Sequence, residues 1–85
     1  MSGYVQSWKM QLEEALSHSN KGKAAFTVIV NPKFILSLTK KPNTCGATLI
    51  VTLMKGTDVS YYFREEDKVH FEKACEMLTS LMYAL

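Results

Sequence analysis

The sequence predicts an α+β fold of two layers, with two helices packed on one face of an antiparallel sheet. Apolar residues recur at steps of three and four near both ends of the chain, which is the period of an amphipathic helix. The region between them is rich in β-branched residues and is divided by short segments that contain glycine or proline. The expected order is therefore α-β-β-β-α, or α-β-β-β-β-α if Pro32 splits the first strand.

The first element is an N-terminal helix for which Ser7 is a candidate N-cap. The pattern fades across residues 17–20, and Gly22 supplies the glycine signal that commonly follows a helix C-terminus. The apolar stripe of this helix consists of Val5, Trp8, Leu12, Ala15 and Leu16.

The sequence predicts strands in the middle of the chain. Residues 24–30 are one, which Asn31-Pro32 interrupts because proline cannot donate a ladder hydrogen bond. Residues 34–39 resume the β pattern, and residues 40–44 form a loop by composition. The clearest strand is 47–54, and a tight turn joins it to a last strand at 59–64. In that last strand, alternation places Val59, Tyr61 and Phe63 on one side and Ser60, Tyr62 and Arg64 on the other.

The last element is the strongest predicted helix. Glu65, Glu66 and Asp67 lie at its start, where the helix dipole favours anions. Its wide apolar stripe consists of Phe71, Ala74, Cys75, Leu78, Leu81, Met82 and Leu85.

Two helices can cover only one face of the sheet, so the second face bears on function. Strand 47–54 is apolar on both sides, and such strands usually have both faces covered. We therefore expect a partner subunit or a ligand on the second face, and a partner would form a homodimer or a heterodimer. The expected interface residues are Ile50, Thr52 and Met54.

Length and composition predict a single α+β domain over residues 1–85. Cys45 and Cys75 are too few for a disulfide framework and indicate reduced thiols. No signal peptide and no apolar run of bilayer length is visible, so we expect a soluble cytoplasmic protein.

The titratable residues predict no enzyme, no cofactor, no small-molecule substrate and no metal site. His18 and His70 are the only histidines, and together with Cys45 and Cys75 they lack the paired spacing of a zinc site. No nucleophile with a neighbouring base is visible in the sequence.

The charge distribution is the main pointer to function. No Asp or Glu lies between Ala15 and Thr57. A purely basic middle of this kind would suit a polyanion such as RNA. The alternative is that these lysines keep a sheet edge soluble and prevent edge-to-edge pairing. The lysines of this stretch are Lys21, Lys23, Lys33, Lys40, Lys41 and Lys55.

Tyr62 and Arg64 are further RNA-binding candidates because they face away from the predicted helices. Tyr62 could stack on a base or ribose, with Arg64 beside it for a phosphate. The alternative is that Tyr62 packs against its cross-strand neighbours.

Two segments resemble the small Alu-domain proteins of the eukaryotic signal recognition particle, and the likeness runs along most of the chain. The segment WKMQLEEALSHSNKGKAAFTVIV resembles the start of the larger subunit, where a helix leads through a short basic or glycine-containing turn to a strand. The segment ATLIVTLMKGTDVSYYFREEDKVHFEKACEMLTSLM resembles that subunit's last hairpin and helix, with Phe71 and Leu78 similarly placed. Tyr4 and Trp8 are similar to the Tyr-x-x-Trp start of the smaller subunit with one residue more, so both subunits remain open.

The resemblance implies a heterodimer whose joined sheets bind structured RNA, with phosphate contacts from basic loops. Its implied function is assembly of the particle's Alu domain, which delays translation elongation during targeting. The loop lysines that match this role are Lys21, Lys23, Lys33, Lys40 and Lys41.

A second hypothesis is a small protein-interaction module, such as the α-β-β-β-β-α domains at the C-termini of some kinases. Its basis is the apolar second face and the modest net charge of +2. In a variant of this hypothesis, the same lysines bind anionic lipid at a membrane surface; otherwise no membrane association is expected.

Overall fold

The computed structural model describes residues 2–22 and 34–83. The α-β-β-β-α order of these residues confirms the predicted fold class. The strand predicted at 24–30, on which the four-strand alternative depends, lies outside the described residues. The elements in chain order are α1 (Ser2–Ser17), β1 (Ile35–Asn43), β2 (Gly46–Leu53), β3 (Asp58–Arg64), the 3-10 helix η3 (Glu65–Asp67) and α3 (Lys68–Met82).

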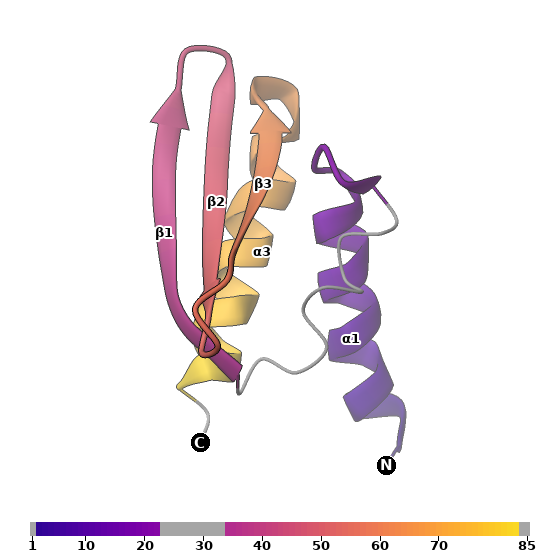
Figure 1. Cartoon of the computed structure of the whole chain (residues 1–85). Coiled ribbons are helices and arrows are strands. Elements are labelled where there is room, and N and C mark those ends of the chain that lie inside the picture. The colour runs from indigo at the N-terminus through magenta and orange to yellow at the C-terminus, as the bar shows by residue number, and fades with distance from the viewer. Residues whose placement is uncertain (1, 23–33, 84–85) are drawn as a thin grey trace.

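The three described strands form one antiparallel sheet in the order β1-β2-β3 (Figure 1). β1 extends to Asn43, so the prediction of a loop over residues 40–44 is wrong for residues 40–43. Pro42 pairs with Ala47 inside this strand. Proline is tolerated there because β1 is an edge of the described sheet, and an edge strand leaves half of its N–H groups unpaired in any case.

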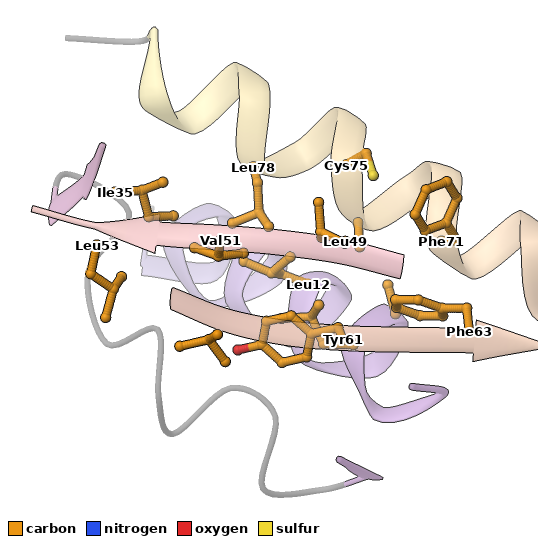
Figure 2. Close-up of a cluster of buried hydrophobic side chains, with 14 residues drawn as sticks. Leu12, Ile35, Leu49, Val51, Leu53, Tyr61, Phe63, Phe71, Cys75 and Leu78 are labelled. Carbon is orange, nitrogen blue, oxygen red and sulfur yellow. The ribbon is translucent and has the colours of Figure 1, made fainter. Parts of the chain in front are cut away.

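Both helices contribute to one apolar core on the same face of the sheet. Figure 2 shows Phe71, Cys75 and Leu78 of α3 turned toward the strands, with Leu12 of α1 in the same cluster. The rings of Phe63 and Phe71 meet edge to face, with centroids 5.6 Å apart. The alternation predicted for β3 is confirmed, because its core-facing residues are the buried Val59, Tyr61 and Phe63.

The other face of the sheet is mostly polar in the described strands. Ile50 lies on this face between Thr48 and Thr52, whereas Leu49 and Val51 enter the core. Within β2, Ile50 is therefore the one large apolar side chain on the second face, which is less apolar than the sequence predicts. The flanking strands add Thr39, Lys41, Ser60, Tyr62 and Arg64 to this polar face.

α1 begins at Ser2, so Ser7 lies inside the helix and is not its N-cap. The helix ends at Ser17, where the apolar pattern fades, and Gly22 adopts a left-handed φ of 57° shortly after it. Within residues 2–22 and 34–83, no helix combines the length and apolar character needed to cross a bilayer.

Candidate nucleic-acid interface

A cavity of about 320 Å³ lies where the β1–β2 turn meets the connection from β3 into α3. Figure 1 shows these two segments at the same end of the sheet. The lining includes four exposed basic residues and one carboxylate, that of Glu65. Lys40 lies on the helix side of the sheet, whereas Lys41 and Arg64 lie on its open face, so these cations make this end of the sheet attractive to anions from both sides. The four basic residues are Lys40, Lys41, Arg64 and Lys68.

The β1–β2 turn is fixed against the start of η3 by hydrogen bonds to one carbonyl. The Glu65 N–H donates to the Cys45 carbonyl at 2.9 Å, and the Tyr62 hydroxyl donates to the same oxygen at 3.2 Å. Gly46 has no space for a side chain, since a Cβ atom would clash with the backbone carbonyl oxygen of Phe63. This close approach sets the position of the β1 lysines relative to the start of α3.

Lys40 and Lys41 are consecutive strand residues and therefore point to opposite sides of the sheet. Lys40 lies on the helix side, near Cys75. Burial raises the pKa of the Cys75 thiol to about 11, and the charge of Lys40 opposes this rise. Lys41 lies on the open face, in register with Thr48. The prediction that both lysines belong to a loop is wrong, although both line the cavity.

Arg64 and Lys68 line the cavity from the other side. The Nη2 atom of Arg64 is 3.5 Å from Glu66 Oε2, and its Nε atom is 3.4 Å from Asp67 Oδ2. The pair with Glu66 is exposed on both sides and contributes little stability, so a phosphate can replace that carboxylate. Lys68 is the first residue of α3, where the helix dipole also favours an anion.

Lys68 is not among the RNA-binding residues predicted from the sequence. It directly follows three acidic residues, so its own charge does not stand out in the pattern along the chain. The signal that could have found it is its place at the start of a helix, close in the chain to the candidate Arg64.

The floor of the cavity is apolar and closed. Phe63 is 0% exposed and Phe71 is 7% exposed, so neither ring offers a free face. A base stacked on an aromatic side chain needs such a face. The cavity therefore suits a phosphate held by charge rather than a base held by stacking.

Tyr62 lies on the open face, as its alternation in β3 predicts, and is half-buried. Its hydroxyl donates to the Cys45 carbonyl, and its backbone N–H donates to Asn20 Oδ1 at 2.9 Å. The hydroxyl bond holds the ring against the β1–β2 turn, so Tyr62 contacts a neighbouring part of the sheet, as the alternative of a packing role predicts. Its stacking on a nucleotide stays a prediction.

The other predicted lysines do not join this cavity within the described residues. Lys21 is exposed and follows Asn20, which is hydrogen-bonded to Tyr62 at the outer edge of β3. It therefore lies at the opposite edge of the sheet from β1. Lys23 and Lys33 lie outside the described residues.

The predicted partner residues point to a different part of the sheet. Ile50 and Thr52 are half-buried on the open face, whereas Met54 follows β2 in the turn and is 60% exposed. The Met54 N–H donates to the Phe34 carbonyl at 2.8 Å, and Phe34 and Leu36 are 61% and 60% exposed. These three exposed apolar side chains thus lie at the end of the sheet remote from the cationic cavity.

Similarity to known proteins does not place this chain in a family. No protein-family model matches it, and no curated protein or solved structure is significantly similar to it. A function is therefore inferred from the cavity and the residues around it.

Proposed function

We propose that this protein is a non-catalytic RNA-binding subunit, of the kind found in the Alu domain of the signal recognition particle, and that it acts in the cytoplasm with a partner subunit. The observation that carries the proposal is that Lys40, Lys41, Arg64 and Lys68 all line one cavity at the same end of the sheet. Cations gathered at one end of the sheet support RNA as the ligand because phosphate contacts dominate the affinity of proteins for nucleic acids.

The binding mode follows from the cavity. Backbone phosphates bind around it: one replaces Glu66 at the Arg64 guanidinium on the open face of the sheet, where Lys41 also lies, and another lies beside Lys68 at the start of α3. Because the rings of Phe63 and Phe71 are covered, recognition rests on the position of phosphates and not on base identity. That mode suits folded RNA, which proteins recognise largely by shape and backbone.

The partner subunit in this proposal binds the opposite end of the sheet. Exposed large apolar side chains gathered in one region are typical of protein interfaces. Ile50 and Thr52 on the open face extend this surface toward the middle of the sheet. RNA and partner therefore use separate parts of the chain. The apolar residues of the partner end are Phe34, Leu36 and Met54.

Fluorescence anisotropy with a structured RNA hairpin, at about 50 mM and about 200 mM salt, tests the proposal. The variant Lys40→Glu/Lys41→Glu should lose RNA binding while its circular dichroism spectrum stays that of the wild type. The matched control is Lys55→Glu/Lys73→Glu, which makes the same charge change at residues that do not line the cavity. The control should keep most of the wild-type affinity.

Two results would contradict the proposal. One is full RNA affinity in the folded Lys40→Glu/Lys41→Glu variant. The other is an equal loss in that variant and in Lys55→Glu/Lys73→Glu, which would indicate an effect of net charge without a defined site.

A protein-interaction module without RNA is the second candidate, and the exposure of Phe34, Leu36 and Met54 favours it. In that case Ile50→Asp or Met54→Asp should break a dimer or complex seen in a sizing experiment. A well-folded dimer that binds no RNA at low salt would favour this second function.

A further inference from the structure

His18, Asp67 and His70 come together from two distant parts of the chain. One candidate ligand atom from each lies within 4.8 Å of the others, and all three residues are half-buried. His18 directly follows α1, Asp67 is the last residue of η3, and His70 lies in the first turn of α3. The prediction of no metal site rested on spacing along the chain, which misses ligands that only the fold brings together.

The polar contacts of His18 resemble those of a metal ligand. Its Nδ1 atom is 3.8 Å from Asp67 Oδ1, and its Nε2 atom is 2.9 Å from Glu14 Oε2. Metal-binding histidines commonly donate their second ring N–H to a carboxylate in this way, which fixes the tautomer and the ring orientation.

The Asp67 carboxylate is oriented as well. Its Oδ2 atom is 3.4 Å from Arg64 Nε, which leaves Oδ1 as the atom nearest to His18. His70 is three residues after Asp67, a spacing at which side chains lie on the same side of a helix. Two imidazoles and one carboxylate, supported by Glu14, therefore face one another between the end of α1 and the start of α3.

We propose that His18, Asp67 and His70 bind a zinc ion, with Glu14 as the outer partner of His18 and water as the fourth ligand. Two imidazole nitrogens and one carboxylate oxygen form a ligand set that zinc uses in proteins. The ion would connect α1 to α3 and would balance the charge of Asp67. Asp67 does not line the cationic cavity, although it contacts the cavity residue Arg64.

Zinc binding requires a defined movement. The two imidazole rings are stacked, with centroids 3.6 Å apart and planes 5° from parallel. Ring nitrogens donate in the plane of the ring, so two parallel rings cannot both direct a lone pair at one ion. A tetrahedral zinc holds its ligand atoms about 3.3–3.4 Å apart, given bonds of about 2.0–2.1 Å. His70 therefore rotates out of the stack on binding and draws the three ligand atoms together.

The test is a competition titration of the purified chain with zinc chloride and a chromogenic chelator. Cys45→Ser serves as the background because Cys45 is an exposed free thiol that could bind zinc by itself. We expect one zinc per chain in that background. His18→Asn and His70→Asn should each weaken binding by at least about ten-fold. Asp58→Asn, which removes an exposed carboxylate outside the cluster, should leave the zinc affinity unchanged.

The histidine ring protons in the NMR spectrum provide a second measurement, which requires no substitution of the proposed ligands. Zinc added below one equivalent should shift the signals of both His18 and His70 in the Cys45→Ser protein. Three results would overturn the proposal: no zinc binding in that background, undiminished binding in folded His70→Asn, or unchanged ring signals in the presence of bound zinc.

Discussion

Asn20 is hydrogen-bonded to both backbone polar groups of Tyr62. The Asn20 N–H donates to the Tyr62 carbonyl at 2.9 Å, and Asn20 Oδ1 accepts from the Tyr62 N–H at 2.9 Å. These two bonds reproduce the pairing that a neighbouring strand would make at the outer edge of β3. One residue thereby joins the end of α1 to the sheet and occupies part of the outer edge of β3.

Asn20→Ala should lower the free energy of unfolding by about 1 kcal/mol, because the Tyr62 N–H loses its acceptor. Asn20→Asp is the matched control, since it keeps an oxygen in the same place and should remain closer to the wild type. Urea unfolding followed by circular dichroism measures both variants. Equal stability of Asn20→Ala and the wild type would show that this bond does not hold α1 to the sheet.

Gly46→Ala should destabilise the protein more than Gly56→Ala. At Gly46 the new methyl group meets the Phe63 carbonyl oxygen, so β2 and β3 must separate where they frame the cavity. At Gly56 the space is open and the cost is the left-handed φ of 94°, about 1–2 kcal/mol for a residue with a Cβ atom. Thermal unfolding of the two variants gives the order, and the reverse order would contradict this account of the turn.

Lys68→Gln should weaken RNA binding and reduce the slope of log K against log salt by about one, as expected for the loss of one phosphate contact. Lys73→Gln is the matched control, because it removes the same charge from an exposed position of the same helix that does not line the cavity. Anisotropy titrations over a range of salt concentrations measure both slopes. An unchanged slope in Lys68→Gln would remove that residue from the interface.

The protein should lose stability in alkaline solution. Burial raises the pKa of the Cys75 thiol from 9.0 to about 11 and that of the Tyr61 hydroxyl from 10.0 to about 12. Because the folded state holds these protons more tightly than the unfolded state, the contribution of Cys75 is complete below pH 9.0 and is lost toward about pH 11. Urea unfolding over this pH range should show a falling free energy of unfolding, with a shallower fall in Cys75→Ala. A free energy of unfolding that rises with pH over this range would contradict the prediction.

The elements that pack into the core could be predicted from the sequence, because the spacing of apolar residues along each element indicates which side is buried. The alternation of Val59, Tyr61 and Phe63 places buried residues correctly. In the predicted stripe of α3, the first four residues are buried, Leu81 and Met82 are half-buried, and Leu85 lies outside the described residues. The prediction failed at residues 40–43, where Lys-Lys-Pro-Asn indicates a loop but edge pairing with β2 forms a strand. The composition of residues 40–43 does not reveal that they pair with β2.

The candidate site was harder to predict because it depends on contacts between distant segments. The basic middle of the chain contains Lys40 and Lys41, but Lys68 and Arg64 join them only through the close approach of Gly46 to Phe63. The cluster of His18 and His70 has the same origin, since α1 packs beside the start of α3. Side chains that meet by folding leave no spacing pattern in the sequence.

The most direct test of RNA binding at the cationic cavity is an amide NMR titration of the wild-type chain with a structured RNA hairpin. Signals of Lys40, Lys41, Arg64 and Lys68 should shift together, and the shifts should weaken as salt is raised. The signals of Phe34, Leu36 and Met54, at the other end of the sheet, should change little. Shifts confined to that apolar end, or no shifts at low salt, would contradict the assignment of the cavity as the RNA-binding site.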